Sequence, residues 1–398
     1  MLLNQILSRE NMLLALQRVE KNKGSHGVDM MPVQNLRQHI VENWISIKEA
    51  ILKGTYEPMP VRRVEIPKPD GGVRLLGIPT VTDRLIQQAI AQVLSRIYDP
   101  MFSEHSYGFR SNRSAHDAVR KAKGYIRDGY RWVVDMDLEK FFDRVNHDRL
   151  MSTLAKTIKE KPLLKLIRKY LQAGVMINGV VSRTEEGTPQ GGPLSPLLSN
   201  IVLDELDKEL ENERTMASVK RFIEGKLRLK VNEKKSAVDR PWKRKFLGFS
   251  FTPSKEPKVR IAKQSLKRMK KKVREITSRK IPYPMEYWIK KLNQYLLGWY
   301  GYFALADTKS IFEDLDGWIR RRLRMCLWKN WKTSKTRIRN LIKLGVPEWK
   351  AYEWGNSRKG YWRISKSPIL HRSLGNSYWS NQGLKSLQKR YEFLRHLS

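Results

Sequence analysis

The first 55 residues carry apolar side chains at intervals of three and four positions, in two stretches on either side of a polar break at 22–27. The stretches include Met12, Leu16 and Val19, then Ile40, Trp44, Ile47 and Ile51. Such spacing lines up apolar side chains along one face of an α-helix. The pattern therefore predicts two helices around the polar break.

From residue 61 the pattern changes to short extended runs. Two of them, 61–66 and 73–78, flank Pro67-Lys68-Pro69-Asp70-Gly71-Gly72, a turn-forming sequence typical of a β-hairpin. Helical spacing returns at 82–97 and 114–128, and an apolar strand follows at Trp132-Val133-Val134.

The second half of the chain is dominated by helices. A Gly- and Pro-rich turn at 185–200 opens into a long helix at 194–211, and basic helices are expected at 265–279, 285–303 and 311–331. Residues beyond 346 are polar, basic and rich in Trp, with no clear period. A chain of this length predicts more than one domain.

The charge balance points to a polyanionic partner. Lys and Arg number 78 against 40 Asp and Glu, a formal net charge of +38. Cations that neutralise phosphates release condensed counterions, so this excess is typical of nucleic-acid binding. The alternative is a basic ribosomal-type or surface-charged protein, although 40% hydrophobic residues and 12 Trp are enough for real cores.

Cysteine usage and hydropathy exclude further classes. Cys326 is the only cysteine, which excludes a disulfide framework and any Cys-pair zinc module in these residues. The opening residues lack the features of a secretory signal, and no run approaches ~18 uninterrupted apolar residues. We therefore expect a cytoplasmic protein.

Acidic residues follow the strand at 132–134. Asp135 and Asp137 share one face of an extended segment. Two-metal phosphoryl transfer holds cations ~4 Å apart on carboxylates from converging strand ends. The pair is a candidate metal site, and the alternative is an ordinary strand end or cap.

Two further segments carry candidate chemistry. The hairpin places Lys68 and Arg74 on flanking strands, where a point charge and a planar fork could clamp a triphosphate; the alternative is a solvated hairpin tip. The turn Gly187-Thr188-Pro189-Gln190-Gly191-Gly192-Pro193 has more glycine and proline than a plain helix entry needs. It favours close approach of the backbone to a substrate.

The helices beyond 265 combine apolar spacing with dense positive charge, which favours a surface that tracks RNA phosphates over a merely solvated basic face. The basic residues expected to project outward are Lys270, Lys271, Lys272, Arg320, Arg321, Arg322 and Arg324. Four later tryptophans could stack on single strands or form a small core: Trp349, Trp354, Trp362 and Trp379.

The order of these segments, followed by Lys245-Phe246-Leu247-Gly248-Phe249-Ser250-Phe251, resembles the reverse transcriptases encoded by group II introns, in particular the bacterial kind without an endonuclease domain. The resemblance is collinear along the chain. Asn22-Lys23-Gly24 with Gly27-Val28-Asp29 is similar to the family's N-terminal extension motif. Tyr107-Gly108-Phe109-Arg110-Ser111-Asn112-Arg113-Ser114-Ala115-His116 is similar to its fingers-to-palm signature.

The resemblance implies an α+β right-hand polymerase fold. Its parts would be an N-terminal extension at 1–55, fingers and palm at 56–240, an α-helical thumb and maturase-specific domain at 241–345, and a small basic DNA-binding-like segment at 346–398. It also implies RNA-directed DNA synthesis with Mg²⁺, together with assistance of intron splicing and mobility. The implied partners are group II intron RNA, target DNA and deoxynucleoside triphosphates.

The same resemblance implies roles for single residues. Asp137 would be the first catalytic, Mg²⁺-binding aspartate, and Asp135 would be structural. Lys68 and Arg74 would hold the nucleotide's phosphates, with Phe142 beneath its sugar. Gln190 and Gly191 would contact the templating pair and the nucleotide. Phe246, Leu247 and Gly248 would form the primer grip.

The family's second carboxylate pair, on a Tyr-x-Asp-Asp hairpin, has no counterpart in this sequence. Two strands of ~5 residues and a turn do not fit between the helix ending near Glu211 and the apolar-periodic stretch from Met216. Asp204 and Asp207, at i and i+3 on a helix, resemble ordinary surface pairs and are not expected to replace it. We therefore expect an incomplete two-metal site and lost polymerase activity, with RNA binding and splicing assistance retained.

The missing hairpin leaves several interpretations open. A truncated or degenerate copy, an engineered deletion and an omitted segment would each produce this sequence. The alternative functions are a non-catalytic RNA-binding splicing cofactor or RNA chaperone, and a degenerate copy without function.

Overall fold

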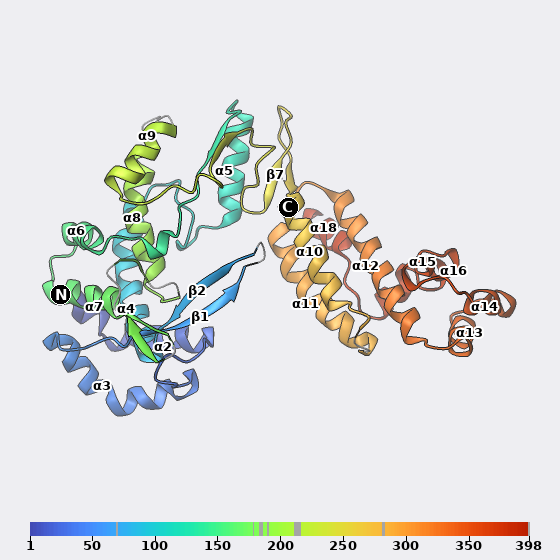
Figure 1. Cartoon of the computed structure of the whole chain (residues 1–398), viewed down its shortest axis with the longest axis horizontal. Coiled ribbons are helices and arrows are strands. Elements are labelled where there is room, and N and C mark those ends of the chain that lie inside the picture. The colour runs from blue at the N-terminus through green and yellow to red at the C-terminus, as the bar shows by residue number, and fades with distance from the viewer. Residues whose placement is uncertain are drawn as a thin grey trace. The chain divides into compact units, whose positions relative to one another are not determined.

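The computed structural model describes residues 1–68, 71–177, 179–182, 186–188, 191–210, 216–280 and 283–396. The chain divides into two compact units, which are treated separately below. Unit 1 comprises residues 1–118 and 133–239, and unit 2 comprises residues 119–132 and 240–398. Both contain many helices and few short strands, so the described part is a mixed and mostly helical α/β structure (Figure 1).

Unit 1 begins with helices and then alternates strands with helices. Its N-terminal elements are α1 (Leu2–Ile6), α2 (Arg9–Asn22), η1 (Val33–Asn35), α3 (Leu36–Lys53), β1 (Val61–Pro67), β2 (Val73–Ile78), α4 (Val81–Tyr98) and η2 (Asp99–Met101). After the excursion into unit 2 come β3 (Val133–Asp135), η3 (Phe141–Asp143), α6 (His147–Thr157), α7 (Lys161–Gln172), β4 (Val175–Ile177), β5 (Val180–Ser182), α8 (Ser195–Leu210), α9 (Met216–Arg221), η4 (Phe222–Lys226) and β6 (Ala237–Asp239).

The predicted hairpin is confirmed and belongs to a larger sheet. β1 and β2 pair antiparallel from Arg62 opposite Ile78 to Pro67 opposite Val73. β1 also pairs parallel with β4, which gives a four-stranded sheet in the order β2-β1-β4-β5. Within the described residues, β3 pairs with β6 alone, as a separate two-stranded antiparallel sheet.

Helix α4 forms the centre of the unit 1 core. Most of its residues are buried, as expected of a helix enclosed by others, and it contacts α1, α2, α3 and α8. Its N-cap, Thr80, accepts from the Asp83 N–H at 3.1 Å. The buried Asp83 carboxylate accepts from Tyr56 Oη at 2.8 Å and Thr80 Oγ1 at 2.7 Å. The Tyr56 hydroxyl therefore anchors the start of α4 to the loop after α3. Burial raises the pKa of Asp83.

Among its described residues, unit 2 contains a β-hairpin, four helices of 13 to 22 residues and several shorter ones. Its elements are α5 (Ala115–Arg127, shared with unit 1 at its first turn), β7 (Phe249–Phe251), β8 (Val259–Ile261), α10 (Lys263–Ile276), α11 (Met285–Phe303), α12 (Lys309–Asn330), α13 (Ser334–Lys343), α14 (Glu348–Gly355), α15 (Tyr361–Ile364), α16 (Pro368–Ser373), α17 (Asn376–Asn381) and α18 (Leu387–His396). Large aromatic residues fill its core, including Trp288, Tyr300, Phe312, Trp328 and Trp379.

The longer helices match the periodicity closely, since α11 has the predicted bounds and α4, α5, α8, α10 and α12 differ only at their ends. Two expectations were incomplete. The first 55 residues form a third, short helix, α1, and the residues beyond 346 form a series of helices of at most ten residues. None of the helices among the described residues combines the length and apolar composition needed to cross a membrane.

Candidate nucleic-acid and nucleotide site

Asp137 lies just beyond the end of β3. Its backbone is held on both sides, because its N–H donates to Ser236 Oγ at 3.0 Å and its carbonyl accepts from the Asn232 N–H at 2.7 Å. The carboxylate is about half exposed, and its Oδ2 lies 3.6 Å from Lys235 Nζ. The carboxylate is therefore accessible and extends from a fixed backbone, with a cation as its neighbour.

The described residues around Asp137 do not form a two-metal centre. In the ranges that the structure describes, no three His, Cys, Asp or Glu side chains gather where they could hold a metal ion. Mg²⁺ requires several oxygen ligands in near-octahedral geometry, and a lysine beside the carboxylate competes with it. Glu211 and Glu213, in the segment where the family's hairpin was expected, lie outside the described residues.

The glycine-rich turn packs against the segment that follows Asp137. The Gly187 N–H donates to Val145 O at 2.8 Å and the Thr188 N–H donates to Phe142 O at 2.6 Å. Gly187 has φ +92°, and an added Cβ would lie 2.8 Å from Phe142 O. Only glycine suits this position, because its φ is positive and the backbone of Phe142 is too close for a side chain.

The same turn also reaches the hairpin. Gly191 has φ +127°, and a Cβ there would lie 2.8 Å from Gly77 O on β2. The structure thus brings three predicted segments together in unit 1: the Phe142 segment, the glycine-rich turn and β2. Gln190 lies outside the described residues, so its predicted contact with the nucleotide stays a prediction.

Lys68 and Arg74 lie at the exposed end of the hairpin. Arg74 is opposite Ile66 in the register, and the Lys68 N–H donates to Gly72 O at 3.0 Å. Opposed residues and residues two apart on one strand share a face of an antiparallel pair. Lys68 and Arg74 are therefore on one face of the ribbon, as clamping a polyphosphate would require.

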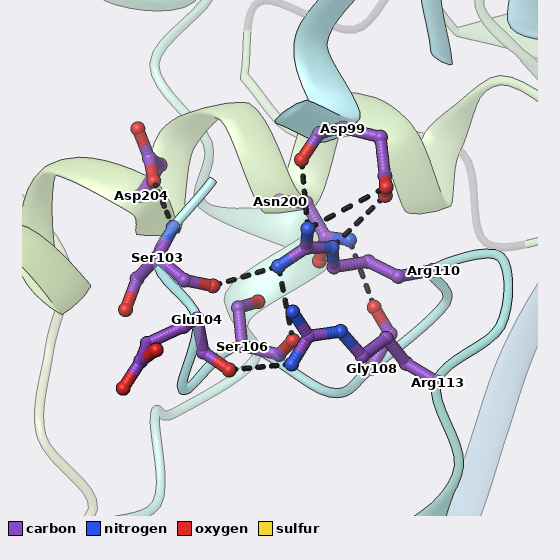
Figure 2. Close-up of polar contacts among 9 residues, drawn as sticks. All are labelled: Asp99, Ser103, Glu104, Ser106, Gly108, Arg110, Arg113, Asn200 and Asp204. Carbon is purple, nitrogen blue, oxygen red and sulfur yellow. Dashed lines mark hydrogen bonds and ion pairs between the residues drawn. The ribbon is translucent and has the colours of Figure 1, made fainter. Parts of the chain in front are cut away.

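The signature segment 107–116 is organised by a buried arginine, shown in Figure 2. The Arg110 side chain is 5% exposed. Its Nε donates to Asp99 Oδ1 at 2.9 Å and its Nη2 donates to Asp99 O at 2.7 Å. Its Nη1 donates to Ser103 O at 2.7 Å and Ser106 O at 3.2 Å. One guanidinium thus joins the start of η2 to the turn before the signature.

Helix α8 holds the same loop from the other side. Asn200 Nδ2 donates to Gly108 O at 2.8 Å, and Asp204 Oδ1 accepts from the Ser103 N–H at 3.2 Å (Figure 2). Asp204 Oδ2 also lies 2.6 Å from Lys208 Nζ. Asp204 is therefore engaged as a structural acceptor. The sequence did not reveal the role of Arg110, because a buried arginine and a surface arginine look alike in a single sequence.

The predicted primer-grip residues form a tight turn in unit 2. Leu247 has φ +49° and Gly248 φ +86°, and Phe246 and Phe249 form an isolated bridge around them. Tyr302 Oη donates to Leu247 O at 2.8 Å, and Ser265 Oγ donates to Gly248 O at 2.9 Å. These two hydrogen bonds hold the backbone of the turn, while the Phe246 and Leu247 side chains remain exposed.

The predicted outward projection of the α12 arginines is wrong for Arg324, which is 4% exposed. Its guanidinium donates to Ser365 O at 3.0 Å and Leu374 O at 3.3 Å. Burial, with Arg320 and Arg321 nearby, lowers the pKa of Arg324 to about 10. The α15 and α16 region covers this face of α12, which periodicity along one helix could not show.

The neighbouring arginines are also only partly exposed. Arg321 lies over the Trp362 ring, 3.9 Å from its centroid, and its Nη2 donates to Trp362 O at 3.1 Å. Arg322 Nη2 donates to Thr277 O at 2.9 Å. Arg320 is half-buried. Arg321 and Arg322 thus join α12 to neighbouring segments, and the predicted contact of all three arginines with RNA stays a prediction.

Helix α10 presents its cations differently. Lys270 is half-buried, with its Nζ 5.7 Å from the Trp318 ring centroid, whereas Lys271 and Lys272 are exposed. Lys267 and Arg268 are exposed on the same helix. The accessible positive charge of this region therefore lies on α10 more than on α12.

The later tryptophans divide between the two predicted uses. Trp379 is buried in the unit 2 core, and its Nε1 donates to Leu374 O at 3.0 Å. Trp349 is 67% exposed, with Lys350 Nζ 4.8 Å from its ring centroid. An exposed indole beside a cation suits base stacking, so Trp349 is the better candidate for nucleic-acid contact.

Comparison with known families matches two parts of the chain. Residues 66–223 match the family described as reverse transcriptase (RNA-dependent DNA polymerase). Residues 266–345 match the family described as group II intron, maturase-specific domain. The first match begins near the end of β1 and contains β2, Asp137 and the glycine-rich turn, and the second contains α11, α12 and α13.

Individual relatives cover parts of the chain. Protein YkfC of Escherichia coli (strain K12) is 36% identical over 233 residues, which are 57% of this chain and 59% of YkfC. Group II intron-encoded protein LtrA of Lactococcus lactis subsp. cremoris is 45% identical over 163 residues, which are 41% of this chain and 27% of LtrA. A solved partial Cas6-RT-Cas1–Cas2 complex covers 69% of this chain and 42% of its own at 24% identity, with a TM-score of 0.38.

Proposed function

Because this chain belongs to the group II intron reverse transcriptase and maturase family, we propose that it binds intron RNA and assists splicing without polymerising DNA. The observation that carries the proposal is the contrast between two regions. The maturase-specific segment is continuous over residues 266–345, whereas the sequence contains no Tyr-x-Asp-Asp. The matched residues span 59% of YkfC and 27% of LtrA. The activity and the partners of this chain are therefore proposals and are not carried over from these relatives.

The loss of polymerisation follows from the number of carboxylates. Reverse transcription by the family uses divalent metal ions, and a two-metal mechanism needs ligands for both. Asp137 supplies one carboxylate, and Lys235 lies 3.6 Å from it. Five residues separate the end of α8 at Leu210 from the start of α9 at Met216, too few for two strands and a turn.

Nucleotide binding can outlast the chemistry. Lys68 and Arg74 on one face of the hairpin, with Phe142 and Gly191 linked through the glycine-rich turn, would still bind a triphosphate.

In this proposal residues 56–240 have the fingers-and-palm arrangement of a right-hand polymerase after an extension at 1–55. Residues 241–345 form the thumb and maturase domain, 346–398 a DNA-binding-like segment, and the protein acts in the cytoplasm.

RNA binding would use exposed cations on α10. Lys267, Arg268 and Lys271 are accessible, whereas on α12 Arg321, Arg322 and Arg324 donate to backbone carbonyls. Each lysine that neutralises a phosphate contributes about 1 to the slope of log affinity against log salt.

Primer extension tests the polymerase half of the proposal. Purified protein is incubated with an RNA template, a DNA primer, all four deoxynucleoside triphosphates and Mg²⁺, beside a commercial reverse transcriptase as positive control. We expect no extended primer. Extension that disappears in Asp137→Ala would refute the proposed loss.

Filter binding to structured intron RNA at ~50 to 200 mM salt tests the RNA half. We expect a steep salt dependence whose slope falls by about 1 in Lys271→Ala. Lys48→Ala, an exposed lysine on α3, is the matched control and should leave the slope unchanged. Equal effects of the two substitutions would contradict an α10 interface. Salt-independent binding would contradict it too and would favour a degenerate copy.

A further inference from the structure

A hollow of about 460 Å³ lies between α10 and α11 in unit 2, and neither family description assigns it a ligand. Its lining comes from the end of α10, from Tyr283 just before α11 and from the first turns of α11, and the two helices contact each other. The residues are Lys272, Glu275, Ile276, Tyr283, Tyr287, Lys291, Gln294 and Tyr295. Ligand pockets for small molecules occupy about 300–1,000 Å³, so the hollow has room for one nucleotide.

Aromatic side chains supply much of the lining. The Tyr283 and Tyr287 rings stack, with centroids 4.3 Å apart and planes 30° apart. They remain 37% and 38% exposed, although stacked rings in a core would be covered. The half-buried Tyr295 and Ile276 give the hollow its less exposed part. A flat ligand can lie against such rings, and every nucleobase offers a flat π-face.

Cations flank the aromatic side chains. Lys291 Nζ lies 5.7 Å from the Tyr287 ring centroid. Lys272 Nζ lies 3.2 Å from Glu275 Oε2. This ion pair is exposed and therefore weak, so a phosphate can replace Glu275 as the partner of Lys272. Two lysines against one glutamate leave the lining positive, which suits a phosphate next to a stacked base. The Gln294 amide, with donors and an acceptor, can contact a base edge.

We propose that this hollow binds one unpaired nucleotide, with its base against Tyr287 and Tyr283 and its phosphate near Lys291 and Lys272. The nucleotide can be free or can belong to single-stranded RNA, and assignment to RNA rests on the RNA-binding function proposed above. Extruding one base would let the maturase segment select unpaired positions, a distinction that phosphate contacts cannot make.

Two fluorescent probes test the site: 2-aminopurine ribonucleoside monophosphate, and a single-stranded RNA carrying one 2-aminopurine. Stacking on Tyr287 should quench either probe. Tyr287→Ala should weaken binding of the RNA probe about tenfold and abolish quenching, whereas Tyr287→Phe, which keeps the ring, should behave like the wild type. Tyr287 is exposed, so neither substitution disturbs the core.

Lysine substitutions on α11 provide the matched control. Lys290 and Lys291 carry the same charge on adjacent exposed positions, but only Lys291 lines the hollow. Lys291→Ala should weaken binding of the probes more than Lys290→Ala does. Equal effects of the two, or quenching that survives Tyr287→Ala, would overturn the site.

The two probes also separate the sources of the nucleotide. Quenching of the RNA probe alone identifies a nucleotide within a strand. Quenching of the monophosphate by a protein that fails to retain structured RNA would support the hollow while refuting the proposed RNA-binding function. RNA retention with no quenching of either probe would refute the hollow alone.

Discussion

Replacing Arg110 with alanine should release the loop before the fingers-to-palm signature. The guanidinium is almost fully buried and donates to the Asp99 carboxylate and to the carbonyls of Asp99, Ser103 and Ser106. Removing one member of a buried ion pair costs about 3–5 kcal/mol, because its partners lose their donors without regaining water. The Asp99 side chain is 32% exposed and can be partly rehydrated, so we expect the lower end, about 3 kcal/mol.

Hydrogen exchange measured by mass spectrometry on peptides covering 102–106 reports this change locally. The Ser106 N–H donates to Ser103 O at 3.1 Å, and the His105 N–H donates to Ser103 Oγ at 3.2 Å. If the free energy of opening the loop falls by about 3 kcal/mol, exchange of these two amide hydrogens should accelerate about a hundredfold. Arg110→Lys keeps the charge but not the planar fork, and should give an intermediate rate.

Arg113→Ala is the control within the same loop. Arg113 Nη1 donates to Glu104 O at 2.6 Å, and its guanidinium lies 5.6 Å from the Tyr107 ring centroid. Because these contacts are more exposed, we expect Arg113→Ala to lower the stability of the loop by less than about 1 kcal/mol. Unchanged protection in Arg110→Ala, or equal acceleration in both variants, would refute the view that one buried guanidinium organises the loop.

Three further predictions concern unit 2. Asp316→Ala should destabilise it by about 2–3 kcal/mol in denaturant melts followed by Trp fluorescence, because this buried carboxylate accepts three hydrogen bonds at the start of α18; an unchanged midpoint would contradict this. Burial opposes ionisation of Asp307, but hydrogen bonds from the Val259 N–H and Arg395 outweigh it and lower the pKa of Asp307. Its stabilisation is therefore present at neutral pH and lost as pH falls below about 4, so the difference in unfolding free energy between wild type and Asp307→Asn should shrink there, and a constant difference would argue against the ion pair. Burial raises the pKa of Cys326 to about 11, so its thiol should react with Ellman's reagent only after denaturation, and rapid reaction in the native state would show that the core opens.

Local patterns predicted the elements where the chain is regular. The hairpin at β1 and β2, and the helices α4, α8, α11 and α12, have a clear period of two or a repeat of three and four, so a single sequence was enough. Short helices such as α15 and α17 contain too few turns to establish a period. They form because tertiary packing stabilises them, as the buried Trp379 in α17 illustrates.

By itself, the sequence determined the basic character of this protein, the order of its motifs and the absence of a Tyr-x-Asp-Asp, since each is a property of residue identity along the chain. Only the tertiary structure decided which charges are accessible. It buries Arg110 and Arg324 under backbone carbonyls while leaving Lys271 exposed, although all three occur in similarly basic or polar surroundings in the sequence. The physical reason is that burial depends on segments distant in the chain, such as α15 and α16 packing over α12, and no periodicity within one helix encodes its neighbours.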